Sequence, residues 1–148
     1  LRERDPDAYN CLTQVTPSFR YRDAGIDLES EGPLIQVDSQ GEPVQVRYSN
    51  RTERIPALPP ETLEAYYAAR HAFYQLITGD ELTLHLKLEP GQMLIIDNYR
   101  LLHGRNAFEL AEGIRHMRQG YVDRDSTLGR LRILRQHFRT SRDLGELT

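Results

Sequence analysis

The stretch ELTLHLKLEPGQMLIIDN, residues 81–98, constrains the fold more than any other part of the chain. Leucine alternates with polar residues over 82–88, which is the period of a β-strand with one buried face. Pro90-Gly91 predicts a turn, and the unbroken apolar run at 93–96 predicts a returning strand that is buried on both faces. The sequence therefore predicts a sheet that other elements cover.

Patterns elsewhere predict further strands. Residues 19–23 alternate aromatic and charged side chains, and residues 33–50 hold two alternating runs joined by Ser39-Gln40-Gly41. Two such runs around a short loop that contains glycine are typical of a β-hairpin. Residues 115–123 are a further strand candidate.

Two segments have the spacing of helices. Over residues 61–77, apolar side chains recur at three- and four-residue steps, Pro60 suits the first turn, and Thr78-Gly79 ends the pattern. A closing helix is predicted at 126–139, with leucines and a phenylalanine along one face. Antiparallel strands with one inserted and one terminal helix favour a mainly β fold of the sandwich or jelly-roll type over a doubly wound sheet.

Composition excludes several classes of protein. We expect the 148 residues to form a single domain, and the lone cysteine, Cys11, excludes a disulfide framework. No segment resembles a signal peptide or a membrane span, so we expect a cytoplasmic protein with no membrane partner. The net charge of −3 argues against a nucleic-acid partner. Eight arginines over 115–142 favour a solvated helical face, with a phosphate-binding face as the alternative.

The five histidines differ in their settings. His103 stands before a glycine, where the backbone can come close to a ligand, at the end of the predicted buried strand region. His116 follows an arginine in a strand candidate and suits either a core or a site. His85 and His137 are expected at the surface, and His71 is expected at the surface or partly packed.

Several blocks of sequence carry a family resemblance. PGQMLIIDNYRLLHGR, followed by GIRHMRQGYVDRD and RLRIL, resembles the C-terminal part of the γ-butyrobetaine and trimethyllysine dioxygenases. These enzymes lie within the taurine-dioxygenase-like family of Fe(II)/2-oxoglutarate oxygenases. RYSNRTERIPALPPETLEAYYAA extends the likeness over nearly the whole chain. The resemblance implies a double-stranded β-helix (jelly roll), of which this chain would be the C-terminal half.

The resemblance also implies roles for particular residues. In this family two histidines and one carboxylate hold the iron, which leaves coordination positions open for 2-oxoglutarate and oxygen. His103 corresponds to the distal histidine of that triad. Arg115 corresponds to the arginine that binds the far carboxylate of 2-oxoglutarate, a task for which a planar, permanently charged guanidinium is suited. Arg118 is its rival, and Arg105 is expected to be structural.

Two further residues correspond to the substrate site of the family. Tyr121 matches an aromatic residue of the trimethylammonium pocket, where a ring face attracts a quaternary ammonium. Asn50 falls where the family often has paired asparagines, one of which meets the substrate carboxylate. Ser49 replaces the first of the pair, so the small-molecule substrate is left open.

The proximal ligands of the family, His-X-Asp or His-X-Glu, do not occur in this sequence. We therefore expect them before Leu1, with this chain as the C-terminal part of a dioxygenase that uses Fe(II) and 2-oxoglutarate and is inactive alone. The alternative is a non-catalytic module that keeps half of the fold. In either case, strands without partners and apolar faces predict a homo-oligomer.

Overall fold

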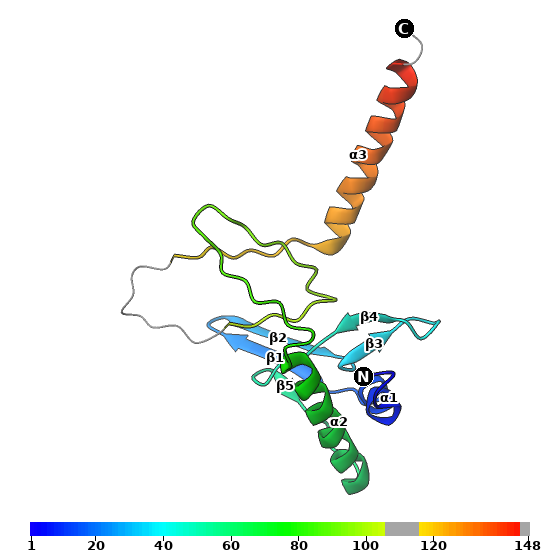
Figure 1. Ribbon diagram of the computed structural model, residues 1–148, viewed down its shortest axis with the longest axis vertical. Helices are drawn as coiled ribbons and strands as arrows, with labels where there is room; N and C mark the ends of the chain where they lie inside the picture. Colours follow the sequence, from blue (N-terminus) through cyan, green and yellow to red (C-terminus); the bar gives the residue numbers. More distant parts are fainter. Residues whose placement is uncertain (106–115, 146–148) are drawn as a thin grey trace. The chain divides into compact units, whose positions relative to one another are not determined.

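The computed structural model describes residues 1–105 and 116–145, with side chains described as far as residue 139 in the last helix (Figure 1). The chain divides into two compact units, Leu1–Arg105 and Asn106–Thr148. Among the described residues, the first unit contains two helices and two small sheets, and the second contains one helix. Strands and helices therefore both occur, as the sequence predicts. The described elements do not display a double-stranded β-helix, which stays a prediction from the resemblance.

The first helix, α1, covers Pro6–Gln14 and was not predicted. The Asp5 carboxylate accepts a hydrogen bond from the backbone N–H of Ala8 at 3.0 Å, which satisfies one of the free donors of the first turn. Pro6 occupies the start of the helix, where its missing N–H costs nothing. Ala8 and Leu12, four residues apart, share the face that α1 buries.

One sheet has the strand order β2-β1-β5, with β1 at Ser18–Asp23, β2 at Ile26–Glu31 and β5 at Glu53–Arg54. Both pairings are antiparallel. Strand β1 confirms the prediction for residues 19–23, whereas β2 and β5 were not predicted.

The predicted hairpin of residues 33–50 is confirmed as a second, two-stranded sheet. It pairs β3 (Ile35–Val37) with β4 (Pro43–Val46) in antiparallel fashion. Its loop needs one residue in the left-handed backbone conformation, and Gly41 adopts it with a φ of 82°. The pairing register shifts between Gln36 and Val37, at a β-bulge or irregularity.

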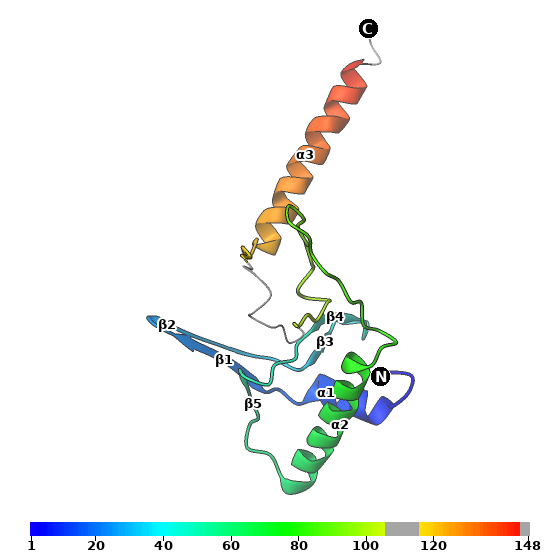
Figure 2. The ribbon, with the colours of Figure 1, turned by 60° about the vertical axis from the view of Figure 1, so that its left-hand side comes forward.

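Helix α2, Pro60–Thr78, confirms the helix predicted over residues 61–77. It buries Tyr66, Ala69 and Phe73 and packs against α1 (Figure 2). Leu12 of α1 and Leu34, just before β3, complete the fully buried centre of this core. Residues 1–78 therefore owe their cohesion to two helices packed beside a hairpin.

The predicted strands at 82–88 and 93–96 are wrong for this structure. Neither segment forms a strand, and all of their apolar side chains except that of Ile96 are exposed, including Leu84 at 78% and Ile95 at 81%. A strand must obtain its backbone hydrogen bonds from a neighbouring strand. Among the described residues, no strand pairs with either segment, so the apolar pattern alone does not produce one.

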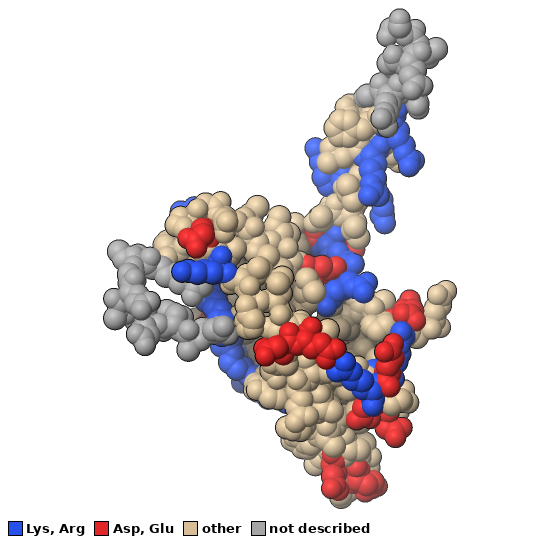
Figure 3. Space-filling model, viewed as in Figure 1, with Lys and Arg blue, Asp and Glu red and all other residues tan. Residues whose placement is uncertain are grey.

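The second unit contains α3, Arg124–Gly145, which confirms the predicted closing helix. The Asp123 carboxylate accepts from the Ser126 N–H at 2.8 Å and so caps the first turn. Figure 3 shows basic side chains along the surface of α3, as an amphipathic, solvated helix would have. Residues 116–123, most of the strand candidate at 115–123, form no strand and are exposed, so that prediction is wrong where the structure describes it. None of the described helices combines the length and apolar character needed to cross a membrane.

Candidate functional site

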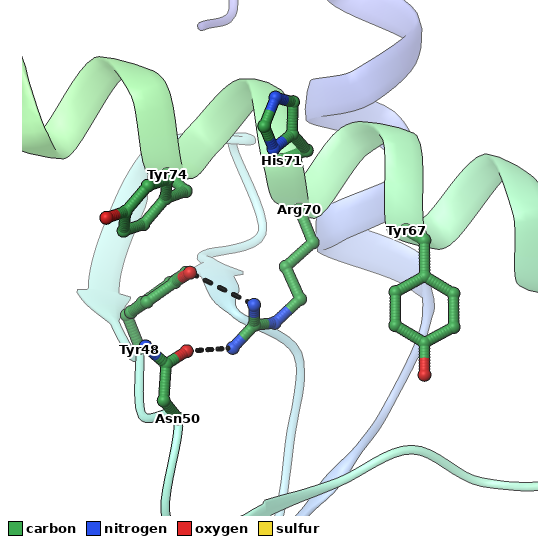
Figure 4. Close-up of a pocket in the computed structure, with 6 residues that line it drawn as sticks. All are labelled: Tyr48, Asn50, Tyr67, Arg70, His71 and Tyr74. Carbon is green, nitrogen blue, oxygen red and sulfur yellow. Dashed lines mark hydrogen bonds between the residues drawn. The ribbon is translucent and has the colours of Figure 1, made fainter.

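Two surface pockets of the first unit share one lining residue, Tyr48, which is called here the shared wall. The first, here the Arg70 pocket, has a volume of about 420 Å³, and the second, the His103 pocket, about 460 Å³. The Arg70 pocket is lined by Tyr48, Asn50, Tyr67, Arg70, His71 and Tyr74 (Figure 4). The lining of the His103 pocket includes Arg47, Tyr48, Ser49, Asn98, Leu102 and His103.

Arg70 projects from the same face of α2 as Tyr66, because residues four apart in a helix are neighbours. Both side chains converge on Glu53 of β5. The Arg70 Nε donates to Glu53 Oε1 at 3.0 Å and its Nη2 donates to Oε2 at 2.9 Å. The Tyr66 hydroxyl donates to Glu53 Oε1 at 2.8 Å. This forked contact holds β5 against the middle of α2.

The Glu53–Arg70 ion pair is largely withdrawn from solvent. The Glu53 side chain is 4% exposed and that of Arg70 is 20% exposed. A buried carboxylate is tolerated only when a charged partner and hydrogen bonds replace its hydration, and Glu53 has both. The hydrogen bond to Glu53 raises the pKa of Arg70. The pKa of Tyr66 is also raised, mainly by burial and secondly by the hydrogen bond to Glu53. Tyr66 therefore stays a neutral hydroxyl donor.

Tyr48 connects this ion pair to the rest of the site. The Arg70 guanidinium lies over the Tyr48 ring, with Cζ 4.5 Å from the ring centroid, and its Nη1 donates to the Tyr48 hydroxyl at 3.0 Å. The Tyr48 ring also contacts Phe73 and Tyr74, at centroid distances of 5.9 and 6.1 Å. Burial raises the pKa of the Tyr48 hydroxyl, so this wall is an uncharged aromatic surface.

His103 is positioned by a turn that is tied to β4. Within the turn, the N–H groups of Arg100 and Leu101 both donate to the Asp97 carbonyl at 3.0 Å. The Val46 N–H donates to the Tyr99 carbonyl at 2.8 Å, which fixes the turn beside the end of β4. Because Arg47, Tyr48 and Ser49 follow the end of β4, they line the same pocket as His103.

The described residues do not by themselves fit an Fe(II) facial triad. Among the side chains that the structure describes, those of residues 1–105 and 116–139, no group of three or more His, Cys, Asp and Glu lies close enough to hold a metal ion. Among the described residues, those that line the His103 pocket include no carboxylate and no second histidine. His103 thus offers one imidazole in a pocket whose other polar atoms are amide, hydroxyl and guanidinium groups.

The structure brings together two of the four predicted site residues. His103 and Asn50 line the two pockets that meet at Tyr48. Tyr121 belongs to the second unit, where it is exposed and its hydroxyl accepts from Gln119 Nε2 at 2.8 Å. Arg115 lies outside the described residues. Of the remaining histidines, His71 and His116 are both exposed, as are His85 and His137.

Sequence reasoning missed Glu53, Tyr48 and Arg70. A signal for Arg70 was present, because it follows Tyr66 by four residues and so shares the buried face of the predicted helix. An arginine on an apolar face requires a carboxylate partner. The sequence does not say which of the acidic residues supplies it.

Comparison with known proteins places the chain among dioxygenases. The family model described as "Taurine catabolism dioxygenase TauD, TfdA family" matches residues 1–121. The chain is 34% identical over 143 residues to a γ-butyrobetaine dioxygenase of Homo sapiens, covering 92% of this chain and 36% of that protein. A γ-butyrobetaine dioxygenase of Pseudomonas sp. (strain AK-1) is 35% identical over 136 residues, with the same coverages. A trimethyllysine dioxygenase of Neurospora crassa is 33% identical over 137 residues, covering 89% of this chain and 28% of that protein. The chain spans about a third of the length of the curated relatives it matches.

Proposed function

This chain belongs to the TauD/TfdA family of dioxygenases, and we propose that it supplies part of the active site of an oxygenase that hydroxylates a small substrate with a trimethylammonium group and a carboxylate. The cofactors in this proposal are Fe(II) and 2-oxoglutarate, which supply the oxidising chemistry. The observation that carries the proposal is the shared wall at Tyr48, because it puts the metal-ligand candidate and the carboxylate-binding candidate on adjoining pockets.

In this proposal each site residue binds or orients a ligand. His103 donates a ring nitrogen to the metal, and Asn50 donates its amide N–H groups to the substrate carboxylate. Arg115 forms the charged, bidentate contact with 2-oxoglutarate, and Tyr121 offers a ring face to the trimethylammonium group. The remaining metal ligands come from outside the described residues, since those residues offer no group of three.

A second candidate function has its own support. The apolar side chains exposed over residues 82–102 and the lack of a three-ligand group in the described part of the chain both suit a non-catalytic module that associates with further copies of itself.

Paramagnetic Mn(II) distinguishes the two functions. We expect Mn(II), added with 2-oxoglutarate to the ¹⁵N-labelled chain, to broaden NMR signals at His103 first and then at Tyr48 and Ser49, which line the same pocket. Binding is expected to be weak, because one imidazole holds such an ion poorly. His103→Ala should abolish the broadening, whereas His85→Ala, at another exposed histidine, should not. Equal broadening at all five histidines would contradict a metal site at His103 and favour the module.

A cosubstrate test examines Arg115. Titration calorimetry with 2-oxoglutarate in the presence of Mn(II) should show weaker binding for Arg115→Ala by about 10- to 100-fold, the effect of losing a charge-assisted hydrogen bond. Arg118→Ala should change the affinity much less. The reverse order would assign the cosubstrate contact to Arg118.

A further inference from the structure

The guanidinium of Arg70 determines which end of the Asn50 amide faces the Arg70 pocket. A guanidinium has five N–H donors and no acceptor. Its Nη2 lies 2.9 Å from Asn50 Oδ1. Of the two ends of the amide, only the oxygen accepts a hydrogen bond, because the NH₂ group is a donor. The carbonyl end of the amide is therefore turned toward Arg70, and the NH₂ end is turned away from it.

The NH₂ end of Asn50 is not used by the protein. Within the part of the chain that the structure describes, Asn50 Nδ2 donates to no protein acceptor, and Asn50 itself is exposed on the pocket wall. Figure 4 shows the Asn50 and Tyr48 oxygens both directed at the Arg70 guanidinium, with Tyr67 and Tyr74 on either side. Two amide protons are thus available to a ligand, in a pocket with aromatic walls.

The charge of Arg70 does not itself dominate this pocket. Glu53 takes three of the four hydrogen bonds that Nε and Nη2 make and carries the compensating negative charge, at 4% exposure. The Arg70 guanidinium is held on both sides, by Glu53 and by the Tyr48 ring 4.5 Å from Cζ. Its Nη2 therefore has a fixed position from which to hold Asn50 Oδ1.

We infer that Arg70 is a positioning residue, which holds the Asn50 amide with its NH₂ group presented to the pocket as the donor for a substrate carboxylate. This inference rests on the proposed function, because that function assigns the carboxylate to Asn50. A lysine in place of Arg70 keeps the charge but lacks the planar fork that contacts Glu53, Tyr48 and Asn50 together. Arg70→Lys should therefore free the amide without removing the positive charge.

The side-chain amide signals of Asn50 report its orientation directly. In the ¹⁵N-labelled full chain, assigned by their loss in Asn50→Asp, these two signals should move on titration with γ-butyrobetaine or with acetate. In Arg70→Lys they should shift toward the positions of a freely rotating asparagine, and the dissociation constant for γ-butyrobetaine should rise about tenfold, the effect of one lost oriented hydrogen bond. Arg51→Lys, the same change at an exposed arginine next to Asn50 in the sequence, is the matched control and should leave the signals in place.

Each outcome tests a separate step. Asn50 signals that are unchanged in Arg70→Lys would overturn the positioning role, whether or not γ-butyrobetaine binds. Signals that move in Arg70→Lys but never respond to γ-butyrobetaine or acetate in the parent chain would overturn the carboxylate contact and, with it, the substrate role of Asn50 in the proposed function. If Arg70→Lys does not fold, Glu53→Gln gives the same test with a smaller shift, because it keeps the shape of Glu53 but weakens its hold on Arg70. Unchanged Asn50 signals there would likewise overturn the inference.

Discussion

Helix α2 and residues 82–96 have equally regular apolar patterns in the sequence, yet they end in opposite environments. In α2, Tyr66 is fully buried and Phe73 nearly so, whereas Leu84 and Ile95 are largely exposed. A helix satisfies its backbone hydrogen bonds within itself and needs a neighbour only for its apolar face. A strand needs a neighbour for its backbone as well. The comparison teaches that an apolar pattern is a stronger predictor of a helix than of a strand, because only the strand depends on a neighbour for its backbone hydrogen bonds.

Strand β2 shows that the neighbour, and not burial, makes the difference. All six residues of β2 are exposed, as are nearly all of residues 82–96. Yet β2 is a regular strand, because β1 pairs with it along its whole length, from Asp23 opposite Ile26 to Ser18 opposite Glu31. Residues 82–96 have no such partner among the described strands.

The largest expected effect comes from one substitution made in both environments. Leu34→Ala should lower the free energy of unfolding by about 2–5 kcal/mol, because Leu34 is fully buried and its loss leaves a cavity. Leu84→Ala removes the same atoms from a position that is exposed in the single chain, and at concentrations too low for self-association it should change this free energy by less than about 0.5 kcal/mol. Urea denaturation followed by circular dichroism measures both values. Equal losses would mean that residues 82–88 are packed in solution, which would break the comparison.

An intermediate effect is expected on self-association. Exposed apolar segments with strand patterns recruit further strands, so we expect this chain to form a homo-oligomer through residues 82–96. Leu84→Glu combined with Ile95→Glu should weaken association about tenfold or more, the effect of placing charges within an apolar contact. Thr83→Glu combined with Lys87→Glu adds charge at polar positions and should weaken it less. Sedimentation at micromolar concentrations measures the association, and a parent chain that stays monomeric throughout would contradict it.

The smallest effect concerns the exposed hairpin of β1 and β2. The Asp27 carboxylate accepts from Arg20 Nη2 at 2.7 Å, and this contact lowers the pKa of Asp27 below its ordinary value of about 3.9. The contact stabilises the folded state above that pH and is lost as the pH falls through the lower, folded pKa. The urea midpoint should therefore drop slightly between pH 5 and pH 3, and Asp27→Asn should reduce the drop. Glu64→Gln, on the exposed face of α2, is the control; an equal reduction there would contradict a specific role for Asp27.

The elements predicted correctly are those whose information is local. Pro60 and the apolar spacing predict helix α2. Gly41, which the loop requires at positive φ, predicts the β3–β4 hairpin. The signals for α1 are equally local, because Asp5 followed by Pro6 is an N-cap with proline in the first turn. Gly25, at a φ of 78° between β1 and β2, likewise marks the missed β1–β2 turn.

The incorrect strand predictions depend on information that no local pattern holds. The alternation of residues 82–88 predicts which face would be buried, but it does not supply a partner strand. The residues of the candidate site likewise fall into those that a local motif predicts and those that it does not. His103 and Asn50 were predicted from motifs, whereas the contact of Glu53 with Arg70 joins residues 17 positions apart and depends on where β5 meets α2. Pairings of this kind are decided by tertiary packing.

The single tyrosine wall between the two pockets limits how relatives of this chain can diverge. A mutation at Tyr48 reshapes the Arg70 pocket and the His103 pocket at once, so selection for a new ligand in one would disturb the other. Positions that line only one pocket, such as Tyr67 or Leu102, are free of that constraint. Among relatives of this chain, changes in ligand preference should therefore accumulate at positions that line only one pocket, whereas position 48 should change slowly.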